Sequence, residues 1–251
     1  MTDKKIPFVG LHAHSVAGSI FDAIGYPNEH MDFCYENGGE ALALTDHGNM
    51  NGFSHQFLHW QKMQAEGKEF KPIFGVEAYF VPSIEEWREE YERSKADKKL
   101  ARTLAKQGET SGATVEDEGA SKTATKSAVN RRRHLVLLAQ NQTGLNNLFK
   151  LISESYKEEN FYRYPRVDYR LLDKYSEGVI AASACLGGPY AGNYWANREE
   201  GPEAVMEAMR ETSRQFVKIF GDRWYGELQW NNIPEQHELN QYIIKVCKEF
   251  D

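Results

Sequence analysis

Residues 6–14 read IPFVGLHAH, an apolar stretch that predicts a short buried strand ending in two histidines. Side chains alternate between the two faces of a strand, so His12 and His14 are expected to point the same way, roughly 6.6 Å apart. Two imidazoles at a strand end could hold one metal ion or bridge two neighbouring ions. Alone, this pattern is weak evidence, because two exposed histidines would produce it too. Its weight depends on the strands that follow.

Further apolar stretches predict strands, and helical patterns separate most of them. The expected strands are 41–45, 72–76, 135–139, 179–182 and 224–228, and the expected helices are 27–37, 52–66, 143–152, 202–220 and 234–250. Repeated strand–helix units with nearly all-apolar strands predict an α/β fold with a parallel sheet covered by helices. Six strands of this kind favour a closed or nearly closed barrel, and an open doubly wound sheet is the alternative.

One segment, at about residues 84–133, interrupts this alternation of strands and helices. Its first half, 85–93, has the alternating charge of an exposed helix, and residues 108–130 are rich in Ser, Thr, Gly and Ala, as flexible segments are. We therefore expect a single domain over residues 1–251 with a flexible insertion at about 84–133. Arg131, Arg132 and Arg133 end this insertion and could contact phosphate, although a solvated charge run is the competing interpretation.

The composition limits which binding partners and which cellular compartment are expected. The net charge of −7 argues against a broad basic surface that grips duplex DNA, although bound divalent metals could supply positive charge locally. The three cysteines are far apart and odd in number, which predicts free thiols and a cytoplasmic protein. No apolar run is long enough to span a bilayer, so no membrane partner is expected.

The ends of the predicted strands carry metal-ligand side chains. In strand–helix barrels the working residues lie on the loops after the strands, and imidazole, carboxylate and thiolate are ligands that Zn, Mn or Fe accept. The residues at these positions are His12, His14, Asp46, His47, Glu77 and Cys185, and Asp22 lies in the loop after the first strand. His134 precedes its predicted strand, so spacing alone makes it a surface residue.

Each of these residues also has a structural explanation. Asp46 could cap the next helix, Glu77 could pair with a buried cation, and Cys185 could be a small buried hydrophobe. Such groups rarely fall at several strand ends in succession by chance, which favours a shared site. The histidines on predicted helices are given no function: His30, His55, His59 and His237.

Five stretches together resemble the PHP (polymerase and histidinol phosphatase) domain, and more narrowly the one at the N-terminus of bacterial and phage DNA polymerase III alpha subunits. They are residues 8–15, 41–49, 71–79, 134–139 and 184–188. The resemblance implies a distorted (β/α)7 barrel that binds two or three divalent metal ions, Zn, Mn or Fe. The implied ligands are His12, His14, Asp22, His47, Glu77, His134 and Cys185, with Asp22 in a loop one residue longer than the family's.

The resemblance also marks a departure at the end of the chain. The family completes its ligand set with a D-x-H motif on a strand after the last predicted helix, and the sequence stops at Asp251 before such a strand. The chain therefore looks cut, its last barrel strand is expected to be missing, and activity of this chain alone is an open question.

The function implied is a metal-dependent phosphoesterase, a 3′–5′ exonuclease that proofreads the primer 3′ end for a replicative DNA polymerase. Asp46 is expected to orient the His47 imidazole, as a carboxylate behind a metal ligand does. The implied partners are DNA, the remainder of the alpha subunit and a separate proofreading subunit. Two alternatives remain: a non-catalytic module that stabilises the polymerase, and a free-standing phosphatase for small phosphate esters. Nothing in the chain resembles the family's nucleotidyl-transfer aspartates, so any polymerase activity would belong to the parent protein.

Overall fold

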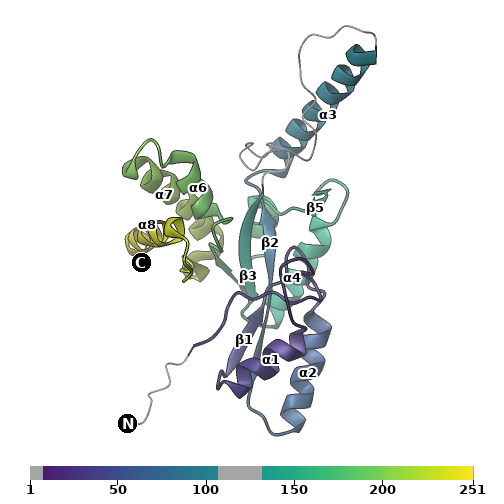
Figure 1. Ribbon diagram of the computed structural model, residues 1–251, viewed down its shortest axis with the longest axis vertical. Helices are drawn as coiled ribbons and strands as arrows, with labels where there is room; N and C mark the ends of the chain where they lie inside the picture. The colour runs from purple at the N-terminus through teal and green to yellow at the C-terminus, as the bar shows by residue number, and fades with distance from the viewer. Residues whose placement is uncertain (1–7, 107–131, 251) are drawn as a thin grey trace.

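The computed structural model describes residues 8–106 and 132–250 of the chain (Figure 1). The helices are α1 (Pro27–Glu36), α2 (Phe53–Ala65), α3 (Ile84–Lys106), α4 (Gln142–Ser155), α5 (Tyr169–Lys174), α6 (Pro189–Asn197), α7 (Pro202–Phe220) and α8 (Pro234–Phe250). The strands are β1 (Ala41–Leu44), β2 (Lys71–Phe80), β3 (Arg133–Ala139), β4 (Phe161–Tyr162), β5 (Tyr164–Pro165), β6 (Val179–Ala182) and β7 (Trp224–Tyr225). Figure 1 shows α1, α2 and α4 around β1 and β2, with α6, α7 and α8 grouped on the other side.

The main sheet has five strands in the order β1-β2-β3-β6-β7. β1 is parallel to β2 and β6 to β7, but β3 is antiparallel to both of its neighbours. The prediction of an all-parallel sheet is therefore wrong. The chain leaves the end of β2 through α3 and re-enters at the same end, so β3 must run back along β2, and Phe80 pairs with Arg133. Among the described residues the sheet is open and mixed, and it does not close into a barrel.

This topology places several chain segments at one rim of the sheet. Because β1, β2, β6 and β7 share a direction and β3 opposes it, the rim holds the ends of four strands and the start of β3. β3 also begins two residues earlier than predicted, so His134 lies inside it, directly opposite Tyr79 of β2. The rim is therefore where residues predicted from strand ends meet a residue that spacing alone placed on the surface.

The expected first strand, residues 6–11, is only partly described, because residues 6 and 7 lie outside the described range. In the remainder, Gly10 forms a single parallel bridge with Leu42 of β1. The amide of Ala43 donates to the Gly10 carbonyl at 2.7 Å, and the amide of Thr45 donates to that of Ala13 at 2.8 Å. The segment thus runs beside β1 and carries His12 and His14 to the rim, although it does not form a continuous ladder.

The expected helices are found because their apolar faces have a sheet or another helix to cover. In α7, Val205, Met209, Phe216 and Phe220 are buried, and the helix ends at Gly221, whose φ of 59° suits glycine. Helix α4 is capped by the Asn141 side chain, which accepts a hydrogen bond from the Gly144 amide at 3.0 Å. Helices α5 and α6 and the small β4–β5 hairpin were not predicted.

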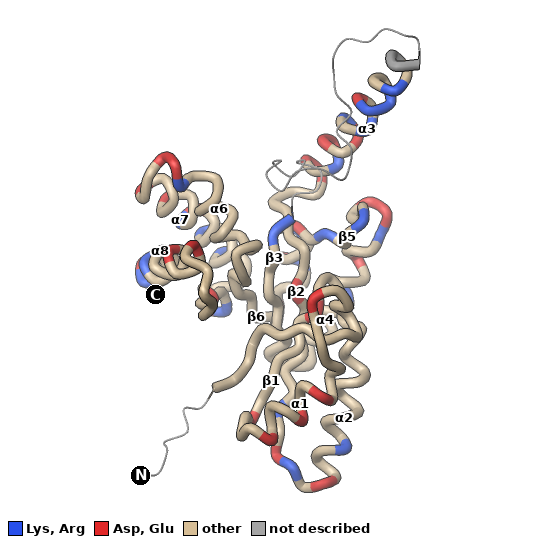
Figure 2. The backbone as a smooth tube through the Cα atoms, in the orientation of Figure 1, with Lys and Arg blue, Asp and Glu red and all other residues tan. Residues whose placement is uncertain are grey.

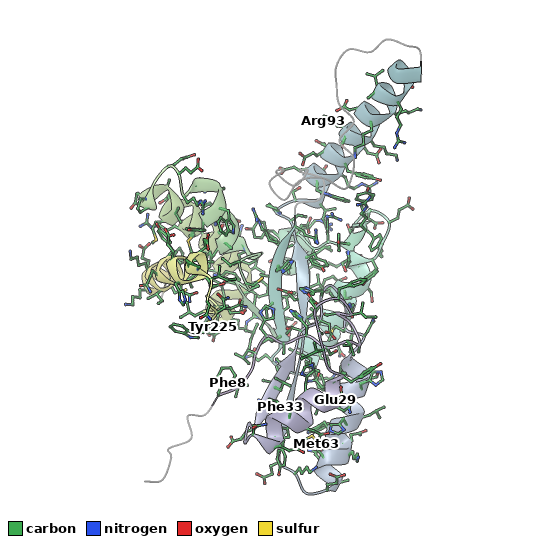
Figure 3. All side chains as sticks on the ribbon, viewed as in Figure 1. Phe8, Glu29, Phe33, Met63, Arg93 and Tyr225 are labelled. Carbon is green, nitrogen blue, oxygen red and sulfur yellow. The ribbon has the colours of Figure 1, made fainter. Side chains whose placement is uncertain are left out.

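The first half of the predicted insertion is a helix, α3, which projects away from the sheet in Figure 1. Acidic and basic residues intermix along it (Figure 2), and Arg93 lies on its projecting part (Figure 3). Its first turn is not outside the core, however, because Ile84 and Trp87 are buried in the main hydrophobic cluster. Residues 107–131, including Arg131, lie outside the described part of the chain. No helix in the described ranges is long and apolar enough to cross a membrane.

Candidate metal centre

Glu77 lies at the centre of a cluster of four histidines at the rim. Its side chain is fully buried. Its Oε1 atom is 3.2 Å from Nε2 of His12 and 3.1 Å from Nδ1 of His134. Its Oε2 atom is 3.5 Å from Nε2 of His14 and 2.5 Å from Nδ1 of His47. One carboxylate therefore connects histidines from three other segments of the sequence.

The backbone fixes these positions. His47 follows β1 and forms an isolated parallel bridge with Glu77, and the amide of Gly48 donates to the Glu77 carbonyl at 2.8 Å. Gly48 has a φ of 66°, and a Cβ atom there would lie 3.0 Å from the Tyr79 ring, so glycine is needed both for conformation and for space. The Tyr79 ring in turn stacks parallel to the His47 imidazole, with centroids 5.9 Å apart.

The donor atoms are arranged as a metal site requires. Two sets each have all their ligand atoms within 4.8 Å of one another: His12, His14 and Glu77, and His47, Glu77 and His134. Among the buried polar atoms of this cluster, His14 Nδ1 has no hydrogen-bond partner within the described structure, and the 2.5 Å contact of His47 Nδ1 with Glu77 Oε2 lacks hydrogen-bond geometry. Because unpaired buried polar atoms are costly, a bound cation is the natural partner for this set. Imidazole nitrogens with a carboxylate suit Zn, Mn or Fe.

The charges of the cluster are strongly coupled. Burial alone would raise the pKa of Glu77, but the adjacent imidazoles of His12, His134 and His47 outweigh it and hold that pKa well below its usual range. Burial opposes protonation of His12, yet Glu227 and Glu77 raise its pKa to about 10. Burial lowers the pKa of His14, which keeps that imidazole neutral and able to bind a metal. Without metal, the cluster is thus a buried ionised carboxylate neutralised by protonated imidazole.

Cys185 lies next to His134 and Glu77 in the cluster. Its Sγ atom lies 3.5 Å from Nδ1 of His134 and 3.9 Å from Oε1 of Glu77. Burial, with the nearby Glu77 charge, raises the pKa of this thiol to about 11. A metal ion would remove that proton, because the thiolate is the ligand form.

A tight turn after β6 presents the cysteine to the cluster. The amide of Gly187 donates to Cys185 Sγ at 3.3 Å, and that of Gly188 to the Cys185 carbonyl at 2.8 Å. A Cβ atom on Gly188 would lie 1.9 Å from the Ser183 carbonyl oxygen. These two amides therefore stabilise the turn.

Asp22 reaches the outer side of the cluster. Its Oδ2 atom lies 2.6 Å from Nε2 of His47, and its side chain is about half exposed, at 49%. All seven implied ligands thus converge on one rim, from the segment before β1, the loops after β1 and β6, and the facing strands β2 and β3.

The expected role of Asp46 is wrong. Both nitrogens of the His47 imidazole face other carboxylates, those of Asp22 and Glu77. The Asp46 carboxylate instead accepts hydrogen bonds from the Ser15 amide at 2.6 Å, the Ser15 hydroxyl at 2.8 Å and the Ser19 hydroxyl at 3.0 Å. Asp46 points back toward the preceding loop, so it fixes the segment between His14 and Asp22 and does not touch the imidazole.

Glu227 was not among the predicted site residues. Its Oε1 atom lies 2.7 Å from Nδ1 of His12, on the side of the ring opposite Glu77. The available signal was its place after the last strand, because β7 ends at Tyr225 and Glu227 follows at the same rim. The strand predicted over residues 224–228 was three residues too long, so Glu227 fell inside it.

Arg132 and His59 are not among the implied ligands, and both make defined contacts of their own. Arg132 lies at the entrance to β3, with its guanidinium carbon 3.6 Å from the centroid of the Tyr164 ring and 4.9 Å from that of Tyr79. His59 is a structural residue, because its Nε2 atom lies 2.8 Å from Asp32 and joins α2 to α1.

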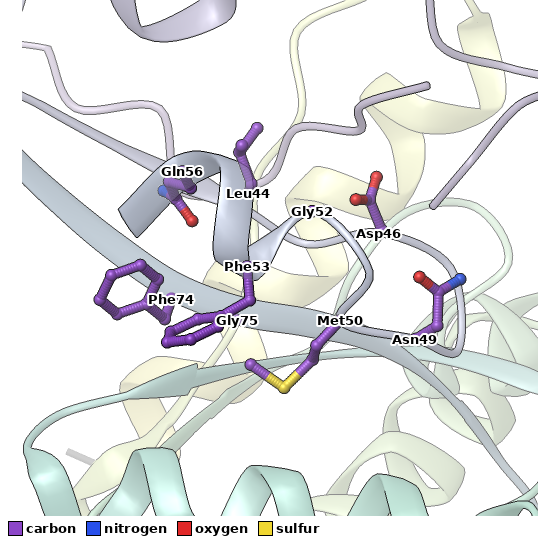
Figure 4. A pocket seen from close by; sticks show the side chains of 9 residues that line it. All are labelled: Leu44, Asp46, Asn49, Met50, Gly52, Phe53, Gln56, Phe74 and Gly75. Carbon is purple, nitrogen blue, oxygen red and sulfur yellow. The ribbon is translucent and has the colours of Figure 1, made fainter. Parts of the chain in front are cut away.

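A small pocket lies behind β1, between α2 and β2 (Figure 4). Its lining consists of Leu44, Asp46, Asn49, Met50, Gly52, Phe53, Gln56, Phe74 and Gly75. None of the seven implied ligands lines it. It is therefore not the candidate metal centre, which is instead a cluster of interacting side chains at the rim.

Comparison with known proteins places this geometry in a family. Residues 10–231 match the PHP domain family. The DNA polymerase III subunit alpha of Aquifex aeolicus is 37% identical over 97% of this chain, that of Borreliella burgdorferi 34% over 96%, and that of Thermus aquaticus 32% over 98%. The chain spans only 16–17% of the length of these relatives.

A solved structure from Bifidobacterium adolescentis, described as that of a metal-dependent phosphoesterase, covers 98% of this chain, and the match covers 85% of that structure. Its sequence identity is 14% and its TM-score 0.43, a likeness too distant to bear on function. The family match covers the whole described sheet and every ligand of the rim cluster. On that basis the chain belongs to the PHP domain family.

Proposed function

We propose that this chain is a metal-dependent phosphoesterase, acting as the 3′–5′ exonuclease or proofreading module of a replicative DNA polymerase alpha subunit. The observation that carries the proposal is the buried Glu77 carboxylate shared by four histidines, one of which has a buried nitrogen, His14 Nδ1, without a hydrogen-bond partner in the described structure. A carboxylate so placed can hold two cation positions next to each other. The relatives named DNA polymerase III subunit alpha support the choice of DNA as substrate.

The residues that would hold two or three divalent cations, Zn, Mn or Fe, are His12, His14, Asp22, His47, Glu77, His134 and Cys185. Bound cations supply two things to phosphate-ester hydrolysis: a more acidic water and neutralisation of charge on the phosphate oxygens. Glu77 is buried and ionised, so it keeps the two ligand sets together. The half-exposed Asp22 marks the side from which a substrate approaches, since the other carboxylate is fully covered.

Arg132 is the described cation best placed to contact a substrate phosphate. Tyr79, which is 5.6 Å from the His134 ring, lies between the metal cluster and this guanidinium. Stacking on Tyr164 and Tyr79 holds the guanidinium plane, and arginine forks suit phosphate geometry. A chain with net charge −7 needs such local positive groups to receive a DNA end.

The same proposal extends to fold, compartment and partners. We propose a single PHP domain over residues 1–251 whose sheet is part of a distorted (β/α)7 barrel, supported by the segment at Gly10 that runs parallel to β1. Three free cysteines support a cytoplasmic location. The remainder of the alpha subunit is a proposed partner, because large apolar side chains such as Phe21 and Ile24 are almost fully exposed beside Asp22. A separate proofreading subunit is a further candidate partner.

The test is hydrolysis of a 5′-labelled primer–template with a mispaired 3′ end, using the purified 251-residue chain with Mn²⁺ or Zn²⁺. We expect metal-dependent shortening from the 3′ end, lost in His134→Ala and in the presence of a chelator. Small phosphate monoesters are assayed in parallel. Hydrolysis of those esters alone would replace the nuclease by a small-molecule phosphatase. Stoichiometric metal binding with no hydrolysis of either substrate would overturn the enzymatic proposal and favour a structural module.

A further inference from the structure

Glu227 contacts a candidate metal ligand from the side that faces away from the metal cluster. The His12 ring has Nε2 toward Glu77, at 3.2 Å, and Nδ1 toward Glu227, at 2.7 Å. His12 and Glu227 are separated by 215 residues in the chain. The contact therefore exists only because β7 and the segment beside β1 reach the same rim.

The Glu227 carboxylate is itself held in place. Its backbone amide donates to the hydroxyl of Ser183, which is 1% exposed, at 2.9 Å. The amide group of Gln229 donates to the same Oε1 atom that faces His12, at 2.8 Å. The carboxylate thus cannot rotate away from the imidazole without breaking a second hydrogen bond.

Helix α8 anchors this arrangement through buried amides. Asn240 donates from Nδ2 to the Gln229 carbonyl at 2.9 Å, and Gln236 donates from Nε2 to Asn240 Oδ1 at 2.9 Å. Gln236 and Asn240 are 1% and 4% exposed. Buried polar networks of this kind specify one arrangement, because breaking any bond leaves a buried group unpaired. The network runs from α8 through Gln229 to Glu227 and then to His12.

We propose that Glu227 is a positioning residue for the metal centre, which holds His12 with a proton on Nδ1 and with Nε2 directed at the cation. A carboxylate behind a histidine ligand fixes its tautomer and raises its basicity, and loss of such a partner typically weakens metal binding by about 10–100-fold. The inference rests on the proposed metal-binding function. A purely structural His12–Glu227 ion pair is the rival explanation.

The test compares Glu227→Ala and Glu227→Gln with Glu199→Gln, a matched control at an exposed glutamate on the loop after α6. Zinc affinity of the full chain is measured by competition with a chelator, and folding by circular dichroism and Tm. We expect about 10–100-fold weaker binding of the most affected zinc ion in Glu227→Ala. Glu227→Gln keeps a hydrogen-bond acceptor but loses the charge, so a smaller loss is expected, and Glu199→Gln should match the wild type.

A second readout reports the tautomer directly. In ¹⁵N-histidine NMR of the zinc-loaded chain, with His12 assigned by its own substitution, we expect a protonated Nδ1 and a zinc-bound Nε2. Glu227→Gln should keep this signature and Glu227→Ala should lose it. Unchanged zinc affinity in a folded Glu227→Ala variant, or zinc on Nδ1 of His12, would overturn the inference alone. If the wild-type chain bound no divalent metal at all, the proposed function would fail with it.

Discussion

The Glu77 carboxylate lies 3.1 Å from the His134 imidazole because their two strands run in opposite directions. Replacing Glu77 by Gln removes the only fully buried anion of the cluster and leaves several imidazoles that repel one another when protonated. We expect Glu77→Gln to lose all tightly bound divalent metal while it remains folded, because the amide is isosteric. Elemental mass spectrometry after buffer exchange measures this directly.

The matched control is Glu69→Gln, at an exposed glutamate in the loop before β2. It should retain the wild-type metal content. If Glu77→Gln also retained it, Glu77 would not be the shared ligand of the two sets.

Metal binding should release protons at neutral pH. The pKa of His12 is raised to about 10 by Glu227 and Glu77 against the effect of burial, and burial raises that of Cys185 to about 11. Both groups are protonated at pH 7.5 and must each lose a proton to bind a cation, so affinity should fall as the pH falls. Calorimetry in buffers of different ionisation enthalpy counts the protons released. A binding enthalpy independent of the buffer would contradict this prediction.

The metal-free chain should lose stability as the solution becomes alkaline. His12 has a folded-state pKa of about 10, above its ordinary value of 6.5. Its contribution is therefore fully present below about pH 6.5 and is lost as the pH rises toward 10. We expect the Tm of the metal-free chain to decrease between pH 6.5 and 10, measured with chelator present. The Glu227→Ala variant should show a weaker decrease, because its His12 lacks the stronger of the two partners.

Asp46→Ala should destabilise the fold, although the Asp46 carboxylate is hydrogen-bonded to Ser15 and Ser19 and not to an implied metal ligand. Asp46 is 3% exposed and accepts three hydrogen bonds from Ser15 and Ser19. Loss of a buried charged acceptor of this kind costs about 2–4 kcal/mol of unfolding free energy. Urea denaturation measures the change, with the exposed Asp222→Ala as the matched control. If Asp46→Ala lost no more unfolding free energy than Asp222→Ala, the hydrogen bonds to Asp46 would not be what stabilises this loop.

Arg132→Ala should weaken substrate binding and spare the metals. If Arg132 contacts a substrate phosphate, KM for the DNA end rises about tenfold, equivalent to about 1.4 kcal/mol, with metal content unchanged. Arg132→Lys should be intermediate, because a lysine cannot stack on the Tyr79 and Tyr164 rings as a guanidinium does. Arg88→Ala, at an exposed position on α3, is the control. An unchanged KM would leave Arg132 with a structural role on the two tyrosines.

Much of the fold could be predicted because its signals are local. β1, β6 and helices α1, α2, α7 and α8 follow apolar runs, helical spacing, Pro at helix starts and Gly at ends. The two-residue strands β4 and β5 and the short helices α5 and α6 were missed, since a few residues carry too little periodicity to stand out. The length of β7 was overestimated for the same reason, which placed Glu227 inside the predicted strand and not after it.

The sequence by itself determined which side chains form the rim cluster. They are histidines, carboxylates and a thiol at or near the ends of strands. Only the tertiary structure decided how they meet. The direction of β3 depends on the end of the sheet at which the chain re-enters after α3, which no local pattern encodes, and this direction brings His134 to Glu77. Likewise, Asp46 turns to Ser15, and Glu227 reaches His12, because contacts between segments far apart in the chain depend on packing and not on spacing.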